Sequence, residues 1–307
     1  MIGKRIFMTG ASGYIGGVVV EQAIQQGNHV TALSRTEASD EKIRTLGATP
    51  VRGGLESHSV LQEQSAQADV VFHLADAWAG NFGKMDYAEV VRIDGGAVDA
   101  IGAGLKGTSK PLVVTSGTLV VGAHPDGLET DENSALSEQP MNDRIRSEQH
   151  ALELRDQGIN VSAIRLAPWV YGRGGSGIRL FMTMFTGMGE VFYIDGGAAP
   201  TSVVHVDDAA QLYFLAADKA QPGDVFNAVS CTTVTARELA TAIARTANLP
   251  LKSLSFDEVT NRMGNFVASF LSAENRASGQ KAKEKLGWEP RGLAILDDIE
   301  SGSYATR

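Results

Sequence analysis

Short apolar runs alternate with amphipathic stretches along the first half of the chain. One helical pattern starts at about residue 14, and a second, short one ends at Gly47. Further helical patterns lie at 57–67, 84–105 and 142–157. Strands that alternate with helices predict a parallel sheet covered by helices on both faces. The predicted fold class is α/β, a Rossmann-type doubly wound sheet with its ligand crevice at the carboxyl ends of the strands. The strand-like runs lie at 4–9, 29–33, 49–52, 70–74, 111–115 and 161–166.

The pattern loosens after about residue 170, where the segments 172–177 and 196–200 are rich in glycine. Helical patterns resume at 206–217, 235–246 and 273–286, and Thr235 with Glu238 has the spacing of a capping box. We therefore expect a dinucleotide-binding domain over 1–170 and a smaller C-terminal substrate lobe over 171–307. Segments such as 203–227 are expected to return to the main domain, with 224–227 as an added strand.

Three glycines occupy the junction between the first strand and the first helix. In that context they allow a sharp turn, a close approach of the backbone to a pyrophosphate, and tight packing of helix on strand. The N–H groups and the positive dipole end of the helix would face the phosphates. The sequence therefore predicts dinucleotide binding by Gly10, Ser12, Gly13, Tyr14, Ile15 and Gly16.

The end of the second strand indicates which dinucleotide is bound. NAD sites usually place a carboxylate there for the ribose 2′-hydroxyl, but this strand ends in Ser34-Arg35-Thr36. A guanidinium can fork around a 2′-phosphate, and Ser34 or Thr36 can add a hydroxyl donor. NADP(H) is the predicted cofactor, and the alternative is that Arg35 is an ordinary solvated residue.

Composition and charge narrow the partners. With 27 basic and 36 acidic residues the net charge is −9, which argues against a nucleic-acid face. Cys231 is the single cysteine and fits a reducing compartment. No apolar run approaches the roughly 20 residues that span a bilayer, the first strand begins almost at Met1, and the histidines lack metal-site spacing. A cytoplasmic protein without a metal is expected.

Several motifs resemble those of the extended short-chain dehydrogenase/reductase family. Residues 9–16 are similar to its TGxxGxxG loop, 69–75 to its fourth strand, and 115–117 to the strand end that carries a catalytic serine or threonine. Residues 165–172 resemble the segment that touches the nicotinamide, and 204–210 and 286–290 resemble later signatures. Where the family favours Gly-Asp-Leu at the adenine, this chain has Gly-Gly-Leu at 53–55. The resemblance implies further cofactor contacts by Leu55, Leu74, Ala75, Thr115, Pro168 and Val170.

One departure from the resemblance concerns the reaction itself. Members of that family normally carry Tyr-x-x-x-Lys, but none of the six tyrosines here is followed by lysine four residues later. Aligned through Ser147, the two positions hold Arg144 and Glu148, which makes the chain similar to atypical members. Arg144 could stabilise an alkoxide but could not supply a proton. The alternative is a solvated pair of Arg144 with Glu148 along one helix.

The remaining candidates are drawn from the crevice. Ser116 could donate a hydrogen bond to a substrate carbonyl, or it could be a strand-end turn residue. Tyr171 and His205 are alternative proton donors, although Tyr171 could pack the nicotinamide loop and His205 could be a core histidine. Trp78, with Phe82 and Tyr87, could contact an aromatic or hydrophobic substrate. The apolar stretch at 181–188 is interpreted as lobe core, and the acidic segment 124–140 as a solvated loop near the site entrance.

Together these features predict an NADPH-dependent oxidoreductase that reduces a carbonyl, or a related polarised double bond, of a small molecule. Two alternatives stay open. One is a non-catalytic NADP sensor resembling nitrogen-metabolite-repression regulators, and the other is an epimerase, isomerase or lyase that uses its cofactor transiently. The resemblance also implies a possible homodimer through the helices at 84–105 and 142–157.

Overall fold

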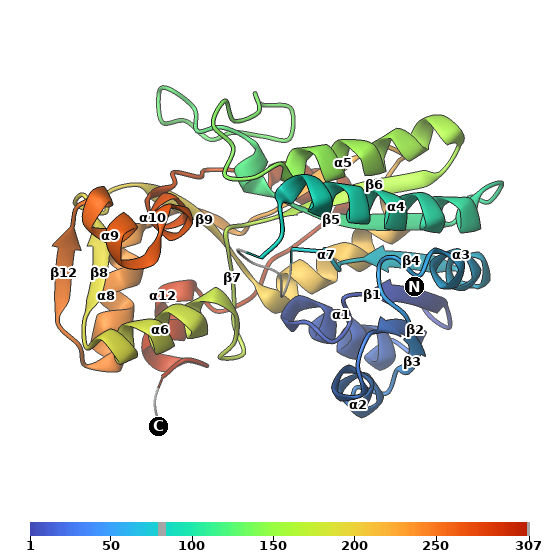
Figure 1. Cartoon of the computed structure of the whole chain (residues 1–307), viewed down its shortest axis with the longest axis horizontal. Coiled ribbons are helices and arrows are strands. Elements are labelled where there is room, and N and C mark those ends of the chain that lie inside the picture. Colours follow the sequence, from blue (N-terminus) through green and yellow to red (C-terminus); the bar gives the residue numbers. More distant parts are fainter. Residues whose placement is uncertain (79–83, 306–307) are drawn as a thin grey trace.

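The computed structural model describes residues 1–78 and 84–305 and has two lobes (Figure 1). The larger lobe is built on a seven-stranded sheet in the order β10-β6-β5-β4-β1-β2-β3, with every neighbouring pair parallel. The predicted α/β doubly wound sheet is confirmed, and the strand expected at 224–227 lies beside β6. The strands are β1 (Arg5–Thr9), β2 (His29–Ser34), β3 (Thr49–Arg52), β4 (Val70–His73), β5 (Pro111–Gly117), β6 (Asn160–Leu166) and β10 (Val225–Ala228).

Helices cover both faces of this sheet, as Figure 1 shows. The first strand explains why, because Ile6 and Met8 enter one hydrophobic cluster while Phe7, pointing the other way, enters another. The first cluster lies under α1 (Tyr14–Gln25), α7 (Val206–Lys219) and α11 (Gln280–Leu286). The second lies under α3 (His58–Gln67), α4 (Tyr87–Leu105) and α5 (Arg144–Glu153), which continues as the 3₁₀ turn η2 (Leu154–Gln157). Helix α2 (Glu37–Thr45) lies at the β2–β3 edge.

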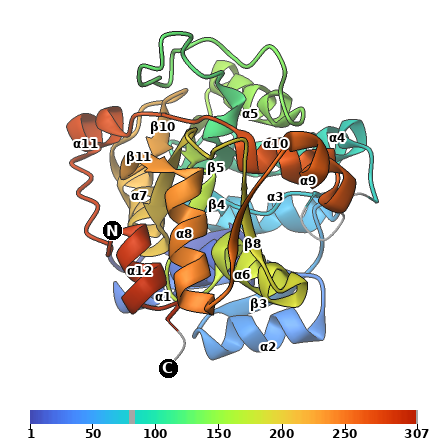
Figure 2. The same cartoon turned by 90° about the vertical axis from the view of Figure 1, so that its left-hand side faces the viewer.

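The smaller lobe has its own core and two small sheets. One sheet has the order β11-β9-β7 and the other pairs β12 with β8. The capping box expected at Thr235 and Glu238 is present at the start of α8. Figure 2 places α8 and α6 towards the viewer on this lobe. The elements are β7 (Trp169–Tyr171), β8 (Val191–Ile194), β9 (Pro200–His205), β11 (Cys231–Thr235), β12 (Leu251–Leu254), α6 (Ser176–Met188), α8 (Ala236–Ala247), α9 (Phe256–Met263), α10 (Asn265–Ser272) and α12 (Ile295–Ser301).

Two expectations about the chain are corrected. The helix expected from residue 273 begins only at Gln280, since residues 273–279 follow an extended course that includes a bridge from Ala277 to Thr130. The acidic segment 124–140 is also not simply solvated. Glu132 packs inward, where its carboxylate accepts a hydrogen bond from the Asn227 N–H at 2.8 Å. Across 1–78 and 84–305, none of the helices combines the length and the apolar character that crossing a membrane requires.

Candidate active site

A cavity of about 250 Å³ lies at the carboxyl ends of β1, β2 and β4. It is the crevice expected for a doubly wound sheet. The structure brings together here seven of the residues predicted to bind the cofactor, namely Gly10, Ser12, Gly13, Arg35, Leu55, Leu74 and Ala75, together with Leu33, Ser39, Gly53, Gly54 and Asp76.

The glycine turn has the geometry that a bound pyrophosphate requires. Gly10 has φ +77°, and a Cβ on it would lie 2.7 Å from the Ala75 nitrogen. A Cβ on Gly16 would lie 2.1 Å from the Gly10 carbonyl oxygen. The N-cap residue of α1 is Gly13, which has no side chain to accept hydrogen bonds from the first turn. The N–H groups of that turn therefore stay open to an anion. The residues present therefore fit a dinucleotide.

The far end of this cavity holds Arg35. Its side chain is exposed, and it has no ion-pair partner among the residues that the structure describes. Ser34 is buried, and its hydroxyl donates to the Thr36 carbonyl at 3.2 Å. The Thr36 hydroxyl is likewise directed to Ser39 Oγ at 3.0 Å. Ser39 lines the cavity in their place, and no local sequence signal marked it.

A second cavity, also of about 250 Å³, lies beyond the end of β5. Its walls are mostly apolar, with Ser116, Asn142 and Arg144 as polar members. Ser116 is 4% exposed, and its hydroxyl has no hydrogen-bond partner among the described residues. A buried hydroxyl without a partner is costly, which is typical of a group that serves a ligand. The lining residues are Trp78, Ser116, Gly117, Leu119, Val120, Met141, Asn142, Arg144, Phe266 and Phe270.

Arg144 connects the two cavities. Its guanidinium forms an ion pair with Asp76, which lines the dinucleotide cavity, and donates a hydrogen bond to the Thr115 carbonyl at 2.9 Å. Both side chains of the ion pair are largely buried, at 18% and 20% exposed. The guanidinium is therefore held against the backbone that carries Ser116. The sequence analysis missed Asp76, although an acid three residues beyond the end of the fourth strand is a readable signal.

The expected pairing of Arg144 with Glu148 is wrong. Glu148 instead forms an ion pair with Arg165 on β6 at 2.6 Å, and the two side chains are 2% and 6% exposed. One turn of α5 thus separates an arginine that faces the cavities from a carboxylate that faces the core. The four-residue spacing permitted a contact, and stronger tertiary partners replaced it.

Trp78 and Thr115 occupy positions beside this cluster. The Trp78 ring lies 5.1 Å from the ring of Tyr87, and both come from the segment that leads into α4. Burial raises the pKa of Tyr87, against the opposing charge and hydrogen bond of Arg144. Thr115 Oγ1 donates to the His73 carbonyl at 3.0 Å and lies 2.7 Å from the Tyr213 hydroxyl. It therefore links β5 to β4 and to α7. Phe82 lies outside the described residues.

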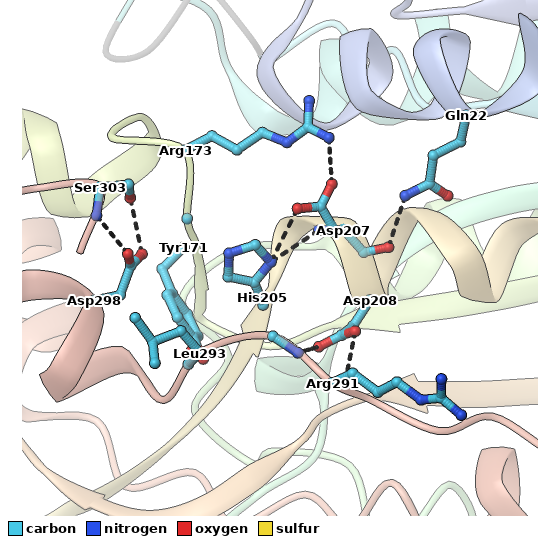
Figure 3. A network of polar contacts seen from close by, with 12 residues as sticks. Gln22, Tyr171, Arg173, His205, Asp207, Asp208, Arg291, Leu293, Asp298 and Ser303 are labelled. Atoms are coloured by element: carbon cyan, nitrogen blue, oxygen red, sulfur yellow. Dashed lines mark hydrogen bonds and ion pairs between the residues drawn. The ribbon is translucent and has the colours of Figure 1, made fainter. Parts of the chain in front are cut away.

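Tyr171 and His205 lie next to each other, with their ring centroids 5.3 Å apart (Figure 3). The Tyr171 hydroxyl donates to the Leu293 carbonyl at 2.7 Å, and burial raises its pKa. His205 caps α7, where its Nδ1 accepts from the Asp207 N–H at 3.3 Å. Neither residue is among those lining the two cavities, and the geometry matches their packing alternatives. Pro168 and Val170 also lie outside those lining sets, at the start of β7.

A loop at 172–175 joins the glycine turn to the smaller lobe. The Tyr14 hydroxyl donates to the Gly172 carbonyl at 2.8 Å, so Tyr14 faces this loop. Tyr304, near the end of the chain, accepts from the Gly172 N–H at 2.7 Å and donates to the Gly175 carbonyl at 2.8 Å. Arg173 adds an ion pair to Glu21 on α1 at 2.6 Å. It also forms one to Asp207 on α7 at 2.5 Å (Figure 3).

No group of three or more side chains suited to a metal ion occurs within the described ranges. The site is therefore defined by its two cavities and by the polar residues between them.

Comparisons with known proteins show which family the chain belongs to. The chain is 34% identical over 301 residues to an uncharacterized protein of Schizosaccharomyces pombe, covering 98% of this chain and 99% of the relative. It is 25% identical to the 4-hydroxy-2-methyl-3-oxo-4-farnesyl-3,4-dihydroquinoline-1-oxide ketoreductase of Stigmatella aurantiaca, covering 80% of this chain and 74% of the relative.

Among solved structures, the UDP-glucose 4-epimerase of Thermotoga maritima with UDP-glucose superposes with a TM-score of 0.77. It is 21% identical, and the match covers 98% of each chain, which supports the fold. The model of the NAD dependent epimerase/dehydratase family matches residues 6–228, which include the glycine turn, Asp76, Ser116 and Arg144. The protein belongs to the NAD dependent epimerase/dehydratase family.

Proposed function

We propose that this protein is an NADPH-dependent oxidoreductase that reduces a carbonyl, or a related polarised double bond, of a small organic molecule. The observation that carries the proposal is the buried, unpartnered Ser116 hydroxyl in the wall of an apolar cavity. Arg144 lies in the same wall, and its partner Asp76 lines the dinucleotide cavity. Similarity to the Stigmatella ketoreductase supports reductase chemistry.

The preference for NADPH rests on Arg35. Its exposed guanidinium lines the dinucleotide cavity beside Ser39 and Gly54. A guanidinium can bind a phosphate through two parallel hydrogen bonds, whereas a ribose hydroxyl offers it no charge. Arg35 therefore favours the cofactor that carries a 2′-phosphate.

The polar residues supply the rest of the chemistry. With NADPH bound in the dinucleotide cavity, the nicotinamide would supply a hydride to the carbonyl carbon, and the carbonyl oxygen would take up one proton from solvent to give the alcohol. Ser116 donates a hydrogen bond to that oxygen, and such a donor contributes about 2.7–4 kcal/mol in the transition state. The positive charge of Arg144 stabilises the negative charge that develops on the same oxygen. Its guanidinium stays protonated, so it does not deliver the proton.

The test is turnover of NADPH with a panel of aldehydes, ketones and conjugated enones, followed by nicotinamide absorbance and product analysis. Ser116→Ala is expected to lower kcat by about 10²- to 10³-fold. Ser65→Ala is the matched control, because that buried hydroxyl also has no partner among the described residues but lies on α3. In the same assay, Arg35→Ala should weaken NADPH far more than NADH.

The competing functions give different results. Tight NADPH binding without turnover of any compound would favour a sensor. Product formed without net change in nicotinamide absorbance would favour an epimerase, isomerase or lyase. Either result overturns the reductase.

A further inference from the structure

The smaller lobe contains a third cavity that the proposed reaction does not use. It is enclosed by α6, β8, β9, α8 and α10, and its walls are mainly aromatic and aliphatic, including Trp169, Phe181, Phe185 and Leu239. Its volume is only about 30 Å³, room for about one water molecule. An apolar space of that kind offers a water few partners and suits a hydrocarbon group.

Phe270 on α10 belongs to the walls of both this cavity and the Ser116 cavity. Its ring lies 5.1 Å from the Trp169 ring and is stacked on Phe181 at 6.1 Å. The side chain is only partly buried. One aromatic ring thus separates the carbonyl site from the interior of the lobe.

The charges of the two cavities restrict the substrate. Among the described residues that line them, Arg144 is the single charged side chain, and Asp76 already neutralises it. A nucleoside diphosphate or another polyanion would find no free cation there. An uncharged molecule with an extended apolar part could leave water and contact the walls of both cavities at little electrostatic cost.

We propose that the lobe cavity is a tail subsite. The substrate is a neutral carbonyl compound with an unbranched alkyl tail, whose terminal end enters this cavity past the Phe270 ring while its carbonyl lies at Ser116. This inference rests on the proposed function for the position of the carbonyl, and Phe270 is the residue that sets tail length.

Binding without turnover tests the subsite. Protein saturated with NADP⁺ is titrated calorimetrically with straight-chain 2-alkanones from butanone to decanone. Affinity is expected to rise by about threefold per added methylene until the tail fills the cavity. Phe270→Ala should strengthen the binding of long ketones relative to butanone, whereas Phe270→Trp should abolish the gain with chain length.

Phe256→Ala is the matched control, since this half-buried phenylalanine on α9 packs on the same core and is absent from both lining sets. Thermal unfolding of each variant checks that it folds. An affinity that does not depend on chain length, or a chain-length series that Phe270→Trp leaves unchanged, overturns the subsite. Chain-length-dependent binding without reduction of any ketone would refute the reductase and leave the subsite standing. Reduction of short ketones, together with an affinity that does not depend on chain length, would support the reductase and refute the subsite.

Discussion

Asp94 lies on the buried face of α4, next to the polar cluster of the site. Its Oδ1 accepts a hydrogen bond from the Ala77 N–H at 2.9 Å. Burial raises the pKa of this carboxyl from 3.8 to about 6, although the Ala77 hydrogen bond lowers it. Between those pH values the native protein holds a proton that the unfolded chain has lost. The stabilisation is therefore complete below the unfolded pKa and is lost as pH rises through about 6.

Asp94→Asn is expected to raise the free energy of unfolding at pH 7 by about 2 kcal/mol, because the neutral amide removes a buried charge and can still accept from Ala77. The gain should shrink towards zero near pH 4, where Asp94 is itself protonated in the native state. Urea denaturation at both pH values measures this. Asp99→Asn, on the exposed side of the same helix, is the control, and an equal gain for Asp94→Asn at both pH values contradicts the assignment.

At the scale of the element, the start of helix α1 contains two adjacent glycines with opposite requirements. A Cβ on Gly16 would lie 2.1 Å from the Gly10 oxygen, whereas on Gly17 the nearest atom would be Leu46 Cδ1 at 3.7 Å. The first position allows the helix to close on the turn. The second is an ordinary interior helix position, where alanine is preferred.

Gly16→Ala should lower the free energy of unfolding by about 1–3 kcal/mol, as overpacking does, and should weaken NADPH binding. Gly17→Ala should raise it by up to about 1 kcal/mol and leave binding unchanged. Chemical denaturation and cofactor titration of the two variants give the comparison. Equal effects of the two substitutions would mean that the turn does not depend on close packing at Gly16.

At the scale of the whole molecule, the C-terminal segment contacts the loop at 172–175. Tyr304 is fully buried and holds Gly172 and Gly175, and Gly172 in turn accepts from Tyr14 in the glycine turn. The C-terminal segment thus contacts the same loop as the first helix. This arrangement couples the two lobes where the dinucleotide is expected.

Tyr304→Phe should cost about 1–3 kcal/mol of stability, since it leaves the buried Gly172 N–H without its partner. It should also weaken NADPH binding, because the 172–175 loop no longer holds Tyr14 in place. Tyr193→Phe, in β8 of the same lobe, is the control. Denaturant melts and NADPH titration are the measurements. A folded variant with unchanged NADPH affinity would show that the loop does not act on the glycine turn.

The sequence alone determined the sheet, the glycine turn and the position of Ser116 at the end of β5. These features depend on local patterns: alternating strands and helices, turn chemistry, and a hydroxyl next to a buried strand. The partners of Arg144 and Glu148 were predicted wrongly for the same reason, since spacing along one helix is also local information.

Tertiary structure decided which charges meet. Asp76 reaches Arg144 across 68 positions of the chain, and Glu148 faces Arg165 because β6 lies under α5. Phe270 likewise becomes a shared wall only when α10 folds against the crevice. Contacts between distant segments depend on how elements pack, and packing leaves no periodic signal in the residues that it brings together.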